Sequence, residues 1–191
     1  MHPLLPEALD ILGRFTKTGQ VSSAGLSDSA RSPIPTLAAP PPGQLPDLSA
    51  ELLAAYLMTE VVQDGGRVWS GAGAGPLEAP VWVITAENPW SERQDGEANE
   101  AAMADLEQTL VGAGLAPVRL VGRAPDGSWS EDCFAVAVGH PASGADAAHV
   151  LGWGRDRGQH AVFLLTTERH TVVQCATGSE LATRPRVLPP R

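Results

Sequence analysis

The amino-acid sequence predicts an α/β (α+β) domain of ferredoxin-like, split βαβ order, with a mainly antiparallel sheet and its helices on one face. From residue 81 onward the hydrophobic pattern indicates strand, helix, strand, strand, helix and strand in succession. The two most apolar strand candidates, residues 81–85 and 134–138, take the first and third places, which are central neighbours in that fold. The turn at residues 125–127 is too short for a parallel crossover, which argues against a doubly wound sheet.

The first 47 residues are expected to form a flexible arm. Residues 7–15 carry apolar side chains at helical spacing and can form a short amphipathic helix. Residues 21–47 are rich in Ser, Pro, Ala and Gly, and have too few apolar side chains to offset the entropy cost of ordering. We therefore expect a disordered N-terminal arm ending in a Pro/Ser-rich linker, followed by a single domain over residues 48–177.

The domain is predicted to begin with a helix and a hairpin. Asp47 and Ser49 are suitable N-cap residues for a helix whose apolar face includes Tyr56. Residues 59–63 and 67–70 read as two strands joined by a turn at Asp64-Gly65-Gly66, which gives an N-terminal hairpin.

The central elements follow from apolar runs and breakers. Residues 81–86 are continuously apolar, so they predict a buried central strand that ends at Asn88-Pro89. A helix is expected over residues 95–114, because acidic residues occupy its first turns and glycines its end. Residues 117–122 and 133–138 are predicted to form a hairpin.

The C-terminal third predicts one more helix and two more strands. The helix is expected over residues 143–157, and the strands over residues 161–166 and 171–175. The Pro/Arg-rich residues 178–191 show no strand alternation, so we expect a frayed tail.

Charge and hydropathy exclude several classes of partner. The 191 residues carry a formal net charge of −9, which repels phosphate backbones, so nucleic acid is an unlikely partner. Arg155, Arg157 and Arg169 could form a modest basic patch, which we interpret as a solvated, ion-paired face. The chain has no apolar run of about 18 residues and no signal-peptide pattern, so we expect a cytoplasmic protein without a membrane span. Cys133 and Cys175 lie in apolar runs and are expected to be reduced.

The common cofactor and catalytic signatures are missing from the sequence. None of the five histidines has a second metal ligand at helical or Cys-x-x-Cys spacing, and there is neither a phosphate-binding loop nor a Gly-x-Ser-x-Gly elbow. We therefore expect no metal and no cofactor.

Polar side chains are predicted to gather where the two central strands meet. The end of the strand at residues 81–85 should lie beside the start of the strand at residues 133–138, and alternation puts Trp129 and Glu131 on one face. Such a rim suits a polar ligand, and it suits equally a closed hydrogen-bond network that fixes the loops. The candidate ligand-binding residues are Thr85, Asn88, Asn99, Trp129, Glu131 and Gln159.

Short motifs in this region resemble those of a known family, the bacterial domain of unknown function 3293. The resemblance extends over residues 52–175, and it implies no activity or cofactor. The residues and motifs that carry it are Tyr56 with Thr59, Thr85-Ala86-x-Asn88-Pro89, Asn99, Gly122 with Trp129-x-Glu131, and Gly158-Gln159-x-Ala161, in that order.

The residues favour a non-catalytic binding or regulatory module that takes a small polar ligand or a protein partner. The alternative is a hydrolase acting on a nucleotide or peptide bond, with Glu131 as general base and His160 as a further acid/base candidate. A third hypothesis, an acidic decoy for a basic partner, depends on charge alone. Nothing in the sequence specifies an oligomeric state.

Overall fold

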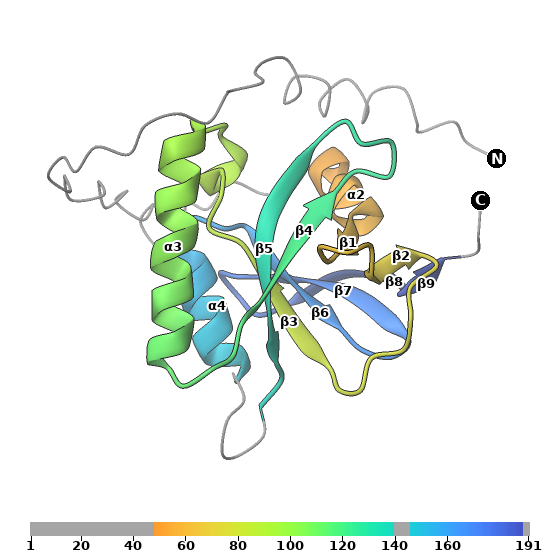
Figure 1. The fold of residues 1–191 in the computed structure, drawn as a ribbon. Helices are drawn as coiled ribbons and strands as arrows, with labels where there is room; N and C mark the ends of the chain where they lie inside the picture. Colours follow the sequence, from red (N-terminus) through yellow and green to blue (C-terminus); the bar gives the residue numbers. More distant parts are fainter. Residues whose placement is uncertain (1–47, 140–145, 189–191) are drawn as a thin grey trace, which may run out of the picture.

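The computed structural model describes residues 48–139 and 146–188 (Figure 1). The predicted arm over residues 1–47, with its helix at residues 7–15, lies outside the described residues, as do residues 140–145 and 189–191. Within the described part, no helix is both long enough and apolar enough to cross a bilayer.

Three α-helices, a short 3-10 helix and nine strands make up the described chain. The helices are α2 (Ala50–Met58), α3 (Gly96–Gly112), α4 (Ala147–Asp156) and η1 (Pro89–Ser91). The strands are β1 (Glu60–Val62), β2 (Val68–Ala72), β3 (Val81–Ile84), β4 (Val118–Arg123), β5 (Ser130–Ala137), β6 (Ala161–Leu165), β7 (Arg169–Gln174), β8 (Glu180–Pro185) and β9 (Val187–Leu188). They form one sheet in the order β8-β7-β6-β3-β5-β4-β1-β2-β9.

The inner four strands have the predicted order. β6, β3, β5 and β4 lie side by side and are antiparallel to one another, as in a split βαβ unit. The two central strands pair as expected, with Val81 opposite Ala137 and Ile84 opposite Phe134. All four residues of β3 are buried, so its continuously apolar sequence matches its central place.

Helices α3 and α4 cover the same face of the sheet. Met103, Leu106 and Leu110 of α3 and Val150 of α4 share one core cluster with side chains of β3, β5, β6 and β7. Each helix begins at an aspartate N-cap, since Asp95 Oδ1 accepts from Ala98 N at 2.8 Å and Asp146 Oδ1 accepts from His149 N at 2.8 Å. Figure 1 shows both helices on one side of the central strands.

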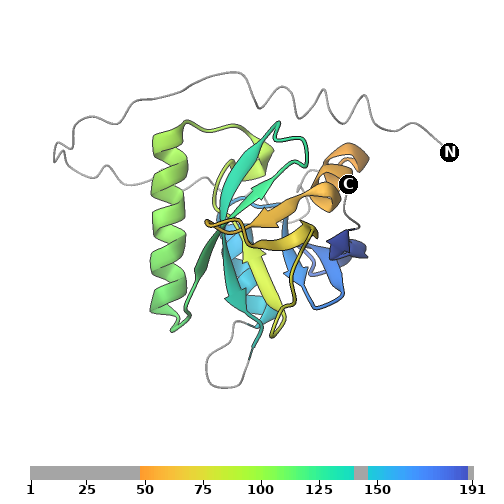
Figure 2. The same cartoon turned by 45° about the vertical axis from the view of Figure 1, so that its right-hand side comes forward.

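Helix α2 corrects the expectation that all helices lie on one face. Its N-cap is Ser49, as predicted, and it packs against β7 and β8. The Tyr56 ring meets the Phe163 ring edge-on at 6.0 Å, and Phe163 packs on the second core cluster. That cluster joins Trp69 of β2 to Leu165 of β6, which requires the sheet to curl (Figure 2). We call the side that holds this cluster and α2 the inner face.

The predicted frayed tail is wrong for residues 180–188. β8 pairs with β7, whereas β9 pairs in parallel with β2, so the chain passes from one edge of the curled sheet to the other. The predicted N-terminal hairpin is confirmed, because β1 and β2 pair across the turn at Asp64. The result is a curled half-barrel, mostly of antiparallel strands.

Two arginines of the tail explain why it is ordered. The Arg184 guanidinium donates from Nη2 to Thr59 O at 2.8 Å and to Ser70 Oγ at 3.2 Å, and from Nε to Leu57 O. Arg186 donates from Nη1 to Trp69 O at 2.7 Å and from Nε to Thr167 O at 3.1 Å. These side chains satisfy carbonyl groups on both sides of the opening, and therefore close the half-barrel.

Candidate functional site

The turn that follows β3 has an unusual backbone. Asn88, Trp90 and Ser91 all have positive φ angles, of 48°, 59° and 58°. Each such residue costs roughly 1–2 kcal/mol unless it is glycine, with asparagine the most tolerant. Among the described residues no other non-glycine residue has a positive φ, so the strain is concentrated in this turn.

Asn88 is the centre of the hydrogen bonds that hold this turn. Its Nδ2 donates to Glu131 Oε1 at 2.7 Å, and its Oδ1 accepts from Gln94 N at 3.0 Å and from Asn99 Nδ2 at 3.2 Å. Asn99 Oδ1 in turn accepts from Asn88 N at 3.0 Å. One side chain therefore connects β3, α3 and the start of β5.

A second group of bonds fixes the turn from the other side. Gln159 Nε2 donates to Glu87 O at 2.8 Å, and Trp90 N donates to Gly158 O at 2.7 Å. A Cβ on Gly158 would lie 2.8 Å from Pro89 Cβ, so only glycine allows this close approach. Thr85 Oγ1 donates to Asp132 O at 2.7 Å.

Glu131 lies on the inner face, at the end of the half-barrel near this turn. Alternation along β5 places it on the side of Cys133 and Ala135, opposite Gly122 of β4. Tyr56 Oη lies 3.4 Å from Ser91 Oγ, and the charge of Glu131 reaches Tyr56. All of these groups are half-buried. We call the group formed by Tyr56, Asn88, Ser91 and Glu131 the Glu131 mouth.

Burial dominates the electrostatics of this region. It raises the pKa of Glu131, opposed by the hydrogen bond from Asn88. Burial also raises the pKa of Glu87 to about 7, helped by the charges of Glu131 and Asp132. The Tyr56 hydroxyl has a raised pKa because it is buried, so it is not an activated nucleophile.

These shifts predict a pH dependence of stability. A carboxyl whose folded pKa lies above its unfolded value stabilises the fold fully below the unfolded pKa, and loses that contribution as pH rises through the folded pKa. For Glu87 the window runs from 4.5 to about 7. In urea unfolding from pH 4 to 8, Glu87→Gln should lose less stability than the wild type between pH 4.5 and 7. Parallel curves would contradict the raised pKa.

The structure brings together most of the predicted site residues. Thr85, Asn88, Asn99, Glu131 and Gln159 all bond to the turn at residues 85–91 or belong to it. Gln159 is 7% exposed, and its side-chain amide donates a hydrogen bond to the backbone carbonyl of Glu87 in the loop.

Two predicted residues have other surroundings. Trp129 Nε1 is buried and has no hydrogen-bond partner among the described residues, so the indole has no bond to this network. The His160 ring meets the Trp90 ring edge-on at 5.5 Å, and no hydrogen bond joins His160 to Glu131 in the described part.

The sequence prediction missed Tyr56 and Ser91 as members of the mouth. Helical spacing assigned Tyr56 to the apolar face of the first helix. This assignment is correct for the ring, but helical spacing does not indicate what the hydroxyl group contacts. Ser91 follows Pro89 in an irregular turn, where no periodicity indicates the direction of a side chain.

A second polar group, Ser70 with His170, is sealed. Ser70 Oγ lies 2.9 Å from His170 Nδ1, and both residues are 0% exposed. Burial and the charge of Arg184 lower the pKa of His170 to about 3, so it is neutral. A serine beside a histidine has the residue types of a nucleophile and its base, but no substrate can reach this pair because both residues are fully buried. The described residues contain no group of three or more side chains that could hold a metal ion.

Residues 84–162 match the model of a protein family described as protein of unknown function (DUF3293). The match confirms the family resemblance for this segment, which is shorter than the expected residues 52–175. It contains the turn at residues 85–91, Asn99, Glu131 and Gln159, whereas Tyr56 lies outside it. No curated protein and no solved structure matches the chain.

Proposed function

We propose that this domain is a non-catalytic binding module whose Glu131 mouth takes a small polar ligand. The observation that supports this most directly is that only one of the two oxygens of the Glu131 carboxyl group has a hydrogen-bond partner among the described residues. Its Oε1 accepts from Asn88 Nδ2 at 2.7 Å, whereas Oε2 has no hydrogen-bond partner among the described residues. Oε2 is not among the sealed polar atoms, and the residue is half-buried, so this oxygen is not cut off from solvent.

The surroundings of Oε2 define the chemistry of the ligand. A carboxyl group in a half-buried site favours a partner that donates hydrogen bonds, such as an amine, an amide or a hydroxyl group. The hydroxyl groups of Tyr56 and Ser91, 3.4 Å apart, offer both donors and acceptors, and the charge of Glu131 reaches Tyr56. Tyr56 and Phe163 add half-buried aromatic surface on the same inner face. This combination of apolar surface and a few directed polar groups is typical of small-molecule sites.

The strained turn supports a binding role as well. Left-handed residues persist where surrounding bonds over-determine them, and such residues gather at ligand sites. Here the bonds from Glu131, Asn99, Gln159 and Gly158 hold the turn before any ligand arrives. A preorganised site loses less conformational entropy when it binds.

A hydrolase with Glu131 as general base remains the second candidate, because a raised carboxyl pKa suits acid/base catalysis. The Tyr56 hydroxyl group has a raised pKa and is therefore a poor nucleophile. A water molecule activated by Glu131 would have to act in its place. The binding function needs no such step, so we favour it.

The experiment is a thermal-shift screen of the full chain against free amino acids, polyamines, nucleosides and sugars. A hit should raise the melting temperature of the wild type saturably, and Glu131→Gln should abolish the shift while remaining folded. The control is Glu100→Gln, which removes an exposed carboxyl of α3 and should keep the shift. A hit that survives Glu131→Gln unchanged contradicts the proposed site.

Turnover separates the two candidates. Each hit is incubated with the wild type and followed by mass spectrometry for hydrolysis products. The binding module predicts that the compound is recovered intact. Hydrolysis that is lost in Glu131→Gln would instead establish the catalytic alternative.

A further inference from the structure

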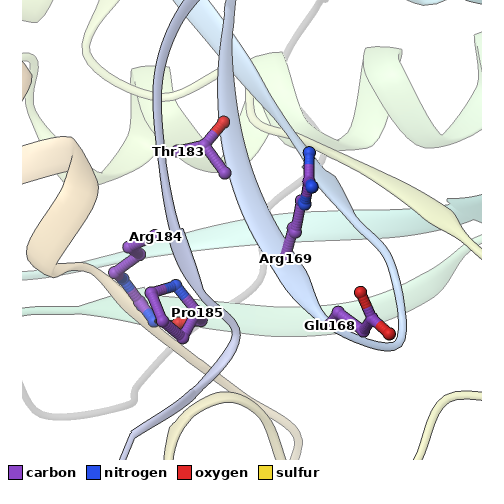
Figure 3. A pocket seen from close by; sticks show the side chains of 5 residues that line it. All are labelled: Glu168, Arg169, Thr183, Arg184 and Pro185. Atoms are coloured by element: carbon purple, nitrogen blue, oxygen red, sulfur yellow. The ribbon is translucent and has the colours of Figure 1, made fainter.

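A second polar hollow lies at the opposite end of the sheet. It has a volume of about 300 Å³ and is lined by Glu168, Arg169, Thr183, Arg184 and Pro185 of the β7–β8 region (Figure 3). The hollow lies beyond the Val81 end of β3. Val81 pairs with Leu165 of β6, and Leu165 pairs with His170 of β7, which directly follows Arg169. Glu131 lies beyond the other end of β3, so the two sites are separate.

The guanidinium group of Arg169 is free to bind a ligand. Arg169 is exposed, and within the described residues its guanidinium makes no hydrogen bond and no ion pair. The basic patch considered for Arg155, Arg157 and Arg169 does not form around it, because Arg157 bonds instead to Asp105 and to Thr109 Oγ1 at 2.7 Å. In Figure 3 the Arg169 side chain points away from Glu168, and Thr183 lies on the neighbouring strand.

Two further arginines add positive charge beside the hollow. Arg184 lines it, and Arg186 is joined to the neighbouring turn by its N–H to Glu168 O at 2.8 Å and by Nε to Thr167 O at 3.1 Å. Within the described residues both guanidinium groups bond to carbonyl or hydroxyl oxygens, and neither forms an ion pair with a carboxylate. The charge of the Glu60 carboxylate also reaches Arg184.

We propose that this hollow binds a small oxyanion, the phosphate or carboxylate group of a metabolite, through the Arg169 guanidinium. Arg169 and Arg184 line the hollow together with one carboxylate, that of Glu168, in a chain whose net charge is −9. Such a local reversal of sign attracts anions. A guanidinium group pairs with carboxylate and phosphate in bidentate geometry, and the Thr183 hydroxyl is a further polar group on the wall. Pro185 leaves an apolar side for the rest of the molecule.

Glu168 sets the specificity of the hollow. Its carboxylate repels a second negative charge, so it weakens dianions more than monoanions. Acetate and inorganic phosphate at constant ionic strength are the two probes that distinguish a carboxylate site from a phosphate site. The probe that binds more tightly identifies the anion class.

The test is a titration of the full chain with each probe, followed by amide chemical shifts in NMR spectra. We expect saturable shifts in β7 and β8 for at least one probe, and about a tenfold or greater loss of affinity in Arg169→Gln. Glu168→Gln should act in the opposite direction and tighten binding. The control is Arg155→Gln, an exposed arginine of α4 outside the hollow, which should leave the affinity unchanged.

Weaker binding in Arg169→Gln together with tighter binding in Glu168→Gln would distinguish a specific anion site from a general effect of added salt. Chemical shifts that fail to saturate would overturn the proposal. An equal loss of affinity in Arg169→Gln and in Arg155→Gln would overturn it as well. Saturable binding that is indifferent to Glu168→Gln would place the anion elsewhere and would overturn it as well. Neither outcome bears on the Glu131 mouth, which is tested by its own variants.

Discussion

Replacing Arg184 by methionine is expected to lower the free energy of unfolding by about 3 kcal/mol or more. The guanidinium is bonded to Leu57 O, Thr59 O and Ser70 Oγ, and its removal leaves these acceptors partly buried without a donor. Each unsatisfied buried group costs roughly 1–3 kcal/mol. Methionine keeps much of the volume of the side chain, so the loss reports the hydrogen bonds. Urea unfolding followed by circular dichroism measures it.

An exposed arginine provides the control for Arg184. Arg119 is 56% exposed and makes an ion pair with Asp132, so Arg119→Met should cost less than about 1 kcal/mol. Equal losses in the two variants would mean that Arg184 does not close the half-barrel.

Replacing Asn88 by alanine is the second change with a large expected effect, a loss of about 4 kcal/mol in the free energy of unfolding. The change removes the bonds to Glu131, Gln94 and Asn99 together, and it leaves alanine at a φ of 48°. Net contributions of about 1 kcal/mol for each hydrogen bond and roughly 1 kcal/mol for the left-handed backbone give this sum. Thermal and urea unfolding both measure the loss.

Asn88→Gly separates backbone strain from the side-chain bonds. Glycine adopts a positive φ without steric cost, so this variant should be more stable than Asn88→Ala by roughly 1 kcal/mol, although it loses the same side-chain bonds. If alanine proved as stable as glycine at this position, the left-handed conformation of Asn88 would be contradicted.

The inner sheet could be predicted because local pattern and global topology agree there. β3 is continuously apolar, and the short turn at residues 125–127 permits only an antiparallel partner for β4. Helix α3 begins at Asp95, where the side-chain cap is a local signal. Elements of this kind depend on residues close in sequence.

The tail and the side of α2 could not be predicted, because their causes are distant in sequence. β8 has no clear alternation of apolar residues, and it is held by Arg184, whose acceptors lie more than a hundred residues earlier. The Pro/Arg-rich composition that suggested fraying carries no information about these bonds. Helix α2 lies on the inner face because the sheet curls, and curl depends on the packing of β2 against β6.

The candidate site was predictable in membership and less so in detail. Strand order brought Asn88 and Glu131 to the same edge, and their bond at 2.7 Å follows from that order. Of the two predicted alternatives, the hydrogen-bond network that fixes the loop is present, with Asn99 and Gln159 as members. The ligand rim stays a prediction, and we propose it for Glu131. Side-chain directions in an irregular turn, such as that of Ser91, have no periodic signal.

A double-mutant cycle on Asn88→Gly and Glu131→Ala tests most directly whether these two side chains meet at the mouth. The hydrogen bond between them predicts a coupling energy of about 1–2 kcal/mol in urea unfolding. The double variant should therefore lose less free energy of unfolding than the two single variants lose in sum. Losses that add within about 0.5 kcal/mol would show that the two residues act independently, and the proposed mouth would then have no basis.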